Sequence, residues 1–104
     1  MSHSRIEQFQ AFLEKDPNNS FARYVIAQEQ AKTGALAEAV ATYRELIRRD
    51  PDYVAAYYHG GKALERMDDP RGAADIYRQG LEVARRTGNA HAGGELQEAL
   101  ATLG

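Results

Sequence analysis

The sequence contains no cysteine and no tryptophan, and only three of its 104 residues are proline. Without cysteine the chain forms no disulfide, and it offers neither a thiol nucleophile nor cysteine ligands for zinc or an iron–sulfur cluster. No apolar run approaches the roughly 18 residues that a membrane-spanning helix needs. These absences exclude disulfide-stabilised, thiol-dependent and membrane-spanning proteins.

An excess of charge of one sign is also missing. Thirteen basic and fifteen acidic side chains give a formal net charge of -2. The two arginine pairs, Arg48-Arg49 and Arg85-Arg86, lie where helices are expected to end, and cations there complement the helix dipole. We therefore expect neither nucleic acid nor a membrane as a partner.

The length and composition suit one small globular domain. Hydrophobic residues make up 43% of the chain and charged residues 27%, which is ordinary for a folded domain. The polar start has neither the apolar segment of a signal peptide nor a lipidation motif, so we expect a cytoplasmic protein. Whether the chain is complete or cut from a larger protein is left open.

The chain repeats itself at an offset of 34 residues. Asp16-Pro17 aligns with Asp50-Pro51, and Tyr43-Arg44 aligns with Tyr77-Arg78. An apolar stripe recurs in the same register, and its three copies are Ile6, Phe9, Phe12 and Leu13; Val40, Tyr43, Leu46 and Ile47; and Ala74, Tyr77, Gly80 and Leu81.

The spacing of each stripe, i, i+3, i+6 and i+7, is typical of a helix that buries one face. Strand-like alternation is missing from the sequence. Proline and glycine interrupt the pattern at regular points, because proline cannot continue the preceding helix. We predict six helices, at about 4–15, 20–33, 36–49, 53–67, 70–86 and 90–103, which pair antiparallel across short loops in an all-α stack.

The repeated residues resemble the tetratricopeptide repeat family, in a small bacterial-type form. The family has a skeleton of aromatic, Leu-Gly, aromatic, Ala and aromatic positions. The second copy matches it with Tyr57, Gly60-Gly61, Leu64, Ala73 and Tyr77, and the first copy with Ile26-Ala27, Ala39, Tyr43 and Pro51. The resemblance implies a right-handed α-solenoid in a single domain, 1–104. Its expected parts are an N-terminal helix at 4–15, a first repeat at 20–51, a second repeat at 54–87 and a capping helix at 90–103.

Some positions depart from the family pattern. Arg23 and Gln30 stand where apolar or aromatic residues are usual, so we expect the first helix pair to be rotated or packed differently. Arg85 stands where the second repeat should end in proline, and we expect the fifth helix to run a turn longer. The last helix has one apolar side, which is expected to cover the end of the stack; this side comprises Ala92, Leu96, Ala99, Leu100 and Leu103.

The resemblance implies that the first helix of each pair lines a concave groove, which receives an extended peptide or a helix of a partner. The groove positions in this sequence are Phe21, Tyr24, Gln28 and Lys32 in the first copy, and Tyr58, His59, Lys62 and Arg66 in the second. Aromatic rings and cations together suit a protein or peptide ligand with an apolar anchor and an acidic group. The alternative is a solvated helix face with half-buried tyrosines.

Some family members use this groove to hold the terminal carboxylate of chaperones. Such a clamp has Lys and Asn where Tyr24 and Gln28 stand here, and another Asn where His59 stands. Those residues are missing, so we do not expect recognition of a chaperone tail.

Catalytic chemistry has little support in the sequence. No set of nucleophile, base and orienting residue can be assembled, and Asp68 and Asp69 are interpreted as helix-capping residues. Gly60-Gly61-Lys62 lacks the spacing of a phosphate-binding loop and is better explained by close helix packing. His3, His59 and His91 are too scattered for a local metal motif. We expect a non-catalytic scaffold or adaptor with no cofactor and no metal.

Self-assembly is the second hypothesis. The first helix resembles the second half of a repeat whose first half is missing, which leaves Ile6, Phe9, Phe12 and Leu13 as candidates for a self-association surface. A homodimer through this edge, or through the last helix, would bury apolar area. The alternative is that these side chains are already covered by residues 20–33.

Overall fold

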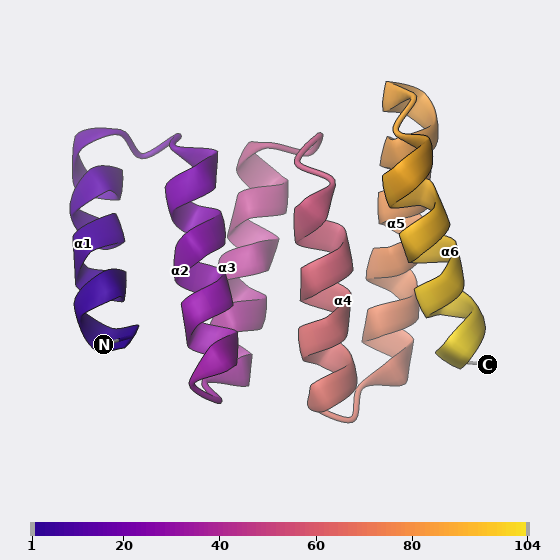
Figure 1. Cartoon of the computed structure of the whole chain (residues 1–104), viewed down its shortest axis with the longest axis horizontal. Helices are drawn as coiled ribbons and strands as arrows, with labels where there is room; N and C mark the ends of the chain where they lie inside the picture. Colours follow the sequence, from indigo (N-terminus) through magenta and orange to yellow (C-terminus); the bar gives the residue numbers. More distant parts are fainter. Residues whose placement is uncertain (1, 104) are drawn as a thin grey trace.

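A computed structural model of the chain describes residues 2–103, with side chains described for 5–103. Six helices make up this range, and no strand occurs in it (Figure 1). They are α1 (Ser2–Lys15), α2 (Ser20–Lys32), α3 (Leu36–Arg49), α4 (Ala55–Arg66), α5 (Pro70–Thr87) and α6 (Ala90–Leu103). The prediction of an all-α solenoid of helix pairs is confirmed.

The starts of three helices are fixed by side-chain caps. Asn19 accepts a hydrogen bond from the backbone N–H of residue 22 at α2, and Asn89 does the same for residue 92 at α6. At α5 the cap is Asp69, whose Oδ1 lies 3.0 Å from the amide nitrogen of Gly72. Each cap satisfies a donor that has no partner inside its helix.

Two turns of the second half differ in how far the sequence predicted them. Helix α5 extends to Thr87 and ends at Gly88, which has a left-handed φ of 72°, so the prediction of a longer fifth helix is confirmed. The capping role expected for the pair Asp68 and Asp69 is correct for Asp69 alone. Asp68 instead has a φ of 58°, a left-handed turn conformation that is uncommon for a residue with a side chain.

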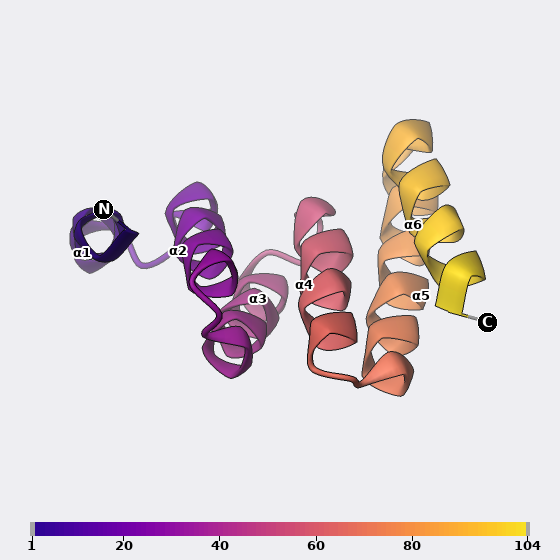
Figure 2. The same ribbon diagram turned by 60° about the horizontal axis from the view of Figure 1, so that its bottom comes forward.

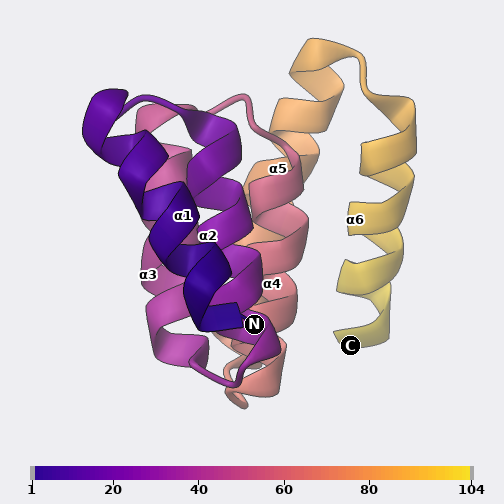
Figure 3. The ribbon, with the colours of Figure 1, turned by 60° about the vertical axis from the view of Figure 1, so that its left-hand side comes forward.

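The helices stand side by side in chain order from α1 to α6 (Figure 1). Each packs chiefly on its neighbours in the sequence, and α4 also contacts both α2 and α6. Figure 2, turned about the horizontal axis, shows α2 and α3 offset from one another across the stack. In Figure 3 α1 lies in front of α2, and α6 stands beside α5 at the far end. Alternate helices therefore share a face.

The core of the second helix pair depends on glycines that let rings approach the helix backbone. A Cβ atom on Gly61 would lie 2.1 Å from Cε1 of Tyr77, and one on Gly80 would lie 2.6 Å from the Cβ of Tyr57. Each pair thus places a tyrosine of one helix against a glycine of the other, a fit that leaves no space for a methyl group. This confirms close packing as the reason for Gly61.

The unusual polar residues of the first pair are held by hydrogen bonds. Nη1 of Arg23 donates to the carbonyl oxygen of Pro17 at 2.8 Å, and the Thr42 hydroxyl donates to Oε1 of Gln30 at 2.7 Å. The structure also buries Glu29, with the Arg5 guanidinium 3.9 Å away across the α1–α2 contact. These partners satisfy polar groups that would otherwise destabilise a helix interface.

None of the helices in the described part of the chain is both long enough and apolar enough to span a bilayer.

Candidate ligand groove

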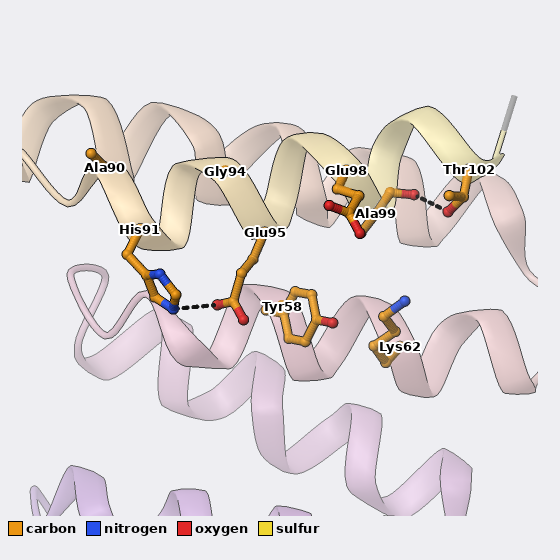
Figure 4. Close-up of a pocket in the computed structure, with 9 residues that line it drawn as sticks. All are labelled: Tyr58, Lys62, Ala90, His91, Gly94, Glu95, Glu98, Ala99 and Thr102. Atoms are coloured by element: carbon orange, nitrogen blue, oxygen red, sulfur yellow. Dashed lines mark hydrogen bonds and ion pairs between the residues drawn. The ribbon is translucent and has the colours of Figure 1, made fainter.

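Two cavities open along the face that α2, α4 and α6 share. The first, which we call the α2–α4 cavity, has a volume of about 230 Å³ and is lined by Gln28, Ala31, Lys32, Tyr43, His59, Lys62, Ala63 and Arg66. The second, the α4–α6 cavity, has a volume of about 440 Å³. Its lining is Tyr58, Lys62, Ala90, His91, Gly94, Glu95, Glu98, Ala99 and Thr102 (Figure 4).

The structure brings most of the predicted groove residues to these cavities. Those that line the α2–α4 cavity are Gln28, Lys32, His59, Lys62 and Arg66, and Tyr58 lines the α4–α6 cavity. Lys62 lines both, so the two cavities adjoin at this side chain. Neither cavity has Phe21 or Tyr24 in its lining.

Tyr24 is committed largely to packing. Its ring lies 5.4 Å from the ring of Tyr53 and 5.6 Å from that of His59, and its hydroxyl accepts a hydrogen bond from Nε2 of Gln28 at 3.1 Å. Burial raises the pKa of the Tyr24 hydroxyl above its ordinary value. Tyr24 therefore supports the wall between α2 and α4.

Phe21 lies at the other edge of α2. Its side chain is 59% exposed, and its ring stands 6.2 Å from that of Phe9 in α1. The offset of 34 residues aligns Tyr24 with Tyr58 but gives no information on which way Phe21 faces, because helix α1 draws Phe21 into a separate aromatic group.

Three cations approach the α2–α4 cavity in different states. Arg66 donates from Nη1 to the carbonyl oxygen of Ala31 at 3.0 Å, which satisfies an acceptor at the end of α2. The ammonium of Lys62 lies 5.4 Å from the Tyr58 ring centroid and 3.8 Å from Oε2 of Glu65. Lys32 is exposed and has no ion-pair partner among the described side chains.

His59 stands half-buried between the two tyrosine rings. Its ring lies 5.6 Å from Tyr24 and 5.2 Å from Tyr58. Burial lowers the pKa of His59, and the charge of Glu95 opposes part of that shift. The imidazole is therefore neutral at pH 7 and offers one donor and one acceptor.

The third wall of the groove was missed from the sequence. We expected α6 only as a cap, and Leu96 and Ala99 are indeed buried in the stack. The same helix also presents Glu95 and Glu98 to the α4–α6 cavity, where Glu95 extends toward Tyr58 (Figure 4). The alternation of helices was the signal available, since a sixth helix must share a face with the second and the fourth.

Carboxylates of α6 are weakly engaged. Oε1 of Glu95 lies 3.8 Å from Nε2 of His91, which is an ion pair only when the imidazole is protonated. Glu98 has no hydrogen bond or ion pair with any described side chain. Both carboxylates are exposed and available to a ligand.

The residues predicted for self-association form an aromatic edge at the start of the stack. Ile6, Phe9 and Leu13 are half-buried against the body, and Phe12 is 43% exposed. The rings of Phe9 and Phe12 meet edge to face at 5.1 Å. We refer to Phe9, Phe12 and Phe21 as the aromatic edge.

Among the side chains that the structure describes, no group of three or more His, Asp or Glu residues is placed to hold a metal ion. His3, which the sequence analysis considered, lies outside the described side chains.

Comparison with known proteins identifies the family. A tetratricopeptide repeat domain protein from Salinibacter ruber, solved by NMR, is 45% identical to this chain, with a TM-score of 0.79 over 85% of this chain and 89% of that one. The chain belongs to the tetratricopeptide repeat (TPR) family. A family model described as TPR repeat matches residues 27–68 of this TPR chain.

Other relatives of the TPR chain differ widely in length. It is 28% identical to TPR repeat-containing protein PA0015 of Pseudomonas aeruginosa, over 88% of this chain and 87% of that protein. It is 35% identical to the human TPR and ankyrin repeat-containing protein 1 over 52% of this chain, but it spans only 2% of that protein. The TPR2B domain of yeast Sti1, solved as a complex with pHsp70, has the same fold with a TM-score of 0.88 at 17% identity, over 94% of this chain and 78% of that one.

Proposed function

We propose that the chain is a non-catalytic protein-interaction module, which binds a peptide or protein segment in the concave groove formed by α2, α4 and α6. The observation that carries the proposal is the pair of adjoining cavities along these helices. Membership of the TPR family, generally a protein-interaction fold, supports it. The Sti1 domain of the same fold, solved with pHsp70, is an example of a relative with a protein partner.

The chemistry of the groove supports a ligand with an acidic group and an apolar anchor. Lys32, Lys62 and Arg66 surround the α2–α4 cavity, whose lining has no carboxylate. Cations around a partly closed site stabilise a bound carboxylate by charge-assisted hydrogen bonds. The half-buried ring of Tyr58 supplies rigid apolar area beside them, as aromatic residues do at interface hot spots.

An affinity experiment tests this assignment. The chain and its Tyr58→Ala/Lys62→Glu variant would each be used to capture partners from native lysate, and the affinity of a captured partner would then be measured for both. We expect the double variant to weaken binding by at least about tenfold, which corresponds to about 1.4 kcal/mol. Unchanged affinity would show that the partner binds elsewhere.

A matched control uses a cation outside the groove. Arg44 is exposed on α3 and lines neither cavity. Arg44→Glu makes the same change of charge as Lys62→Glu, and we expect it to leave the affinity within about twofold, as is usual for a surface substitution away from an interface.

The aromatic edge favours a second function, self-assembly through Ile6, Phe9, Phe12 and Leu13. Phe12 and Phe21 are exposed by 43% and 59% on the same side of the stack, on either side of Phe9. Burying such an apolar patch against a second copy would be favourable. Sedimentation across a range of concentrations tests it, and a monomer at hundreds of micromolar would contradict it.

A further inference from the structure

The two cavities of the groove carry opposite charge. Three cations and no carboxylate line the α2–α4 cavity. In the α4–α6 cavity the carboxylates of Glu95 and Glu98 face one ammonium, that of Lys62. The sign of the charge therefore changes along the groove from α2 to α6, with Lys62 at the boundary.

The charges at both ends of this gradient lack strong partners inside the chain. Glu98 and Lys32 have no hydrogen bond or ion pair with any described side chain. The contact of Glu95 with His91 is long, at 3.8 Å, and the Glu95 side chain is 49% exposed. A ligand group of opposite charge would gain these interactions without breaking a strong internal ion pair.

The acidic wall is arranged around an aromatic surface. Glu95 and Glu98 are three residues apart on α6, so both carboxylates project from one side of the helix. The Tyr58 ring lies below them on α4 (Figure 4). Carboxylates beside an aromatic ring suit a lysine or arginine side chain, whose methylene stem packs on the ring while the charged head pairs with the acids.

We infer that the segment bound in the groove carries a basic side chain, which enters the α4–α6 cavity beside Glu95 and Glu98, while an acidic group of the same segment lies in the α2–α4 cavity. The inference rests on the proposed groove function and names the chemistry of its ligand. The partner is thus a peptide segment with a Lys or Arg and an Asp, Glu or terminal carboxylate, separated by the Lys62 boundary. A uniformly acidic segment would bring its second charge against the carboxylates of α6.

A library of short random-sequence peptides provides the probe. The immobilised chain would select peptides from the library, and the bound pool would be sequenced for the enrichment of each amino acid. The same selection would be made with Glu95→Gln/Glu98→Gln and with Lys32→Gln. A control variant, Glu38→Gln/Asp75→Asn, removes two negative charges from α3 and α5, at positions that line neither cavity.

We expect the native chain and the control to enrich basic and acidic residues together in the same peptides. Glu95→Gln/Glu98→Gln should reduce the enrichment of Lys and Arg by about fivefold, as for loss of a partly exposed ion pair, and keep the acidic enrichment. Lys32→Gln should reduce the acidic enrichment alone.

Two other results would overturn the inference in distinguishable ways. A bound pool without basic enrichment, or with basic enrichment that survives Glu95→Gln/Glu98→Gln, overturns the inference and leaves the groove function standing. A pool no larger than the one retained by Tyr58→Ala/Lys62→Glu overturns both the inference and the proposed groove.

Discussion

The pairs α2–α3 and α4–α5 have the same period but distribute side-chain volume in opposite ways. In the second pair Tyr57 lies on the first helix, and Gly80 faces it from the second. At the equivalent positions of the first pair, 34 residues earlier, stand Arg23 and Leu46, and Leu46 is fully buried. The repeat therefore constrains the total volume at this contact more tightly than the helix that supplies it, as expected for a densely packed core.

The largest test of this comparison is to add one methyl group at Gly61. Gly61→Ala should destabilise the fold by about 3 kcal/mol, because the new Cβ would lie 2.1 Å from the Tyr77 ring. The equivalent residue of the first pair is Ala27, and Ala27→Gly should cost only about 1 kcal/mol, for the lost methyl group and the freer backbone. Urea unfolding followed by circular dichroism measures both.

Gly94→Ala is the matched control for that experiment. A Cβ at Gly94 would meet no atom within 4 Å, so this change should stabilise α6 by about 0.5 kcal/mol through helix propensity. Equal losses at Gly61 and Ala27 would show that the two pairs tolerate volume alike and would refute the comparison.

The buried tyrosines Tyr43 and Tyr77 provide the next test, at high pH. Burial raises the pKa of both hydroxyls, and for Tyr77 a hydrogen bond to Glu65 adds to the effect. Above pH 10 the unfolded chain releases these protons and the folded chain retains them, so stability should fall as pH rises, by up to about 1.4 kcal/mol per pH unit for each tyrosine. Unfolding measured from pH 8 to 11 would reveal this slope.

Phenylalanine substitutions separate the two tyrosines. Each of Tyr43→Phe and Tyr77→Phe should remove one group from the alkaline slope. At pH 7 only Tyr77→Phe should cost about 1 kcal/mol, because it loses the hydrogen bond to Glu65. An alkaline slope that stays unchanged in both variants would mean that other groups control it.

A smaller difference concerns His59, whose equivalent in the first pair is the buried Val25. Since burial lowers the pKa of His59, the unfolded chain takes up this proton first as pH falls below about 6.5, and stability decreases. The loss should be less than about 1 kcal/mol, because Glu95 offsets part of the burial effect. Unfolding at pH 5 and 7 should show this loss in the native chain, and His59→Gln should remove it.

The smallest expected effect lies in the turns between paired helices. The first pair has Gly34 at a φ of 90°, and the second has Asp68 at a φ of 58°. Asp68→Gly should therefore stabilise the fold by about 0.5 kcal/mol, because glycine adopts the left-handed region without a Cβ clash. A decrease in the urea midpoint would show that the Asp68 side chain contributes a favourable interaction that outweighs this strain.

The helices were predictable because their signals are local. The prolines and glycines between stripes, together with the apolar spacing within them, located all six helices to within two residues. The glycine at Gly61 was likewise predictable from its place in the repeat. Only the repeat register was needed for these features, and neither required knowledge of distant contacts.

The rest depended on contacts between distant residues. Nothing near Glu29 in the sequence indicates that Arg5 will lie beside it, and the exposure of Phe21 depends on where α1 packs. Glu95 and Glu98 have no equivalents in the first two groove helices, so the repeat pattern could not assign them to the groove. Their position follows from the arrangement of whole helices, which the spacing of apolar residues does not specify.

Helix α1 contacts only α2 within the described part of the chain. Its unfolding therefore breaks a single interface, whereas opening α4 breaks its contacts with both chain neighbours and with the groove helices on either side. Amide hydrogen exchange should consequently be fastest in α1 and slowest near α4, as in a one-dimensional array that frays from its ends. A segment bound across α2, α4 and α6 would link helices that the chain itself couples chiefly through neighbours, and would slow the exchange of α6 along with that of α2.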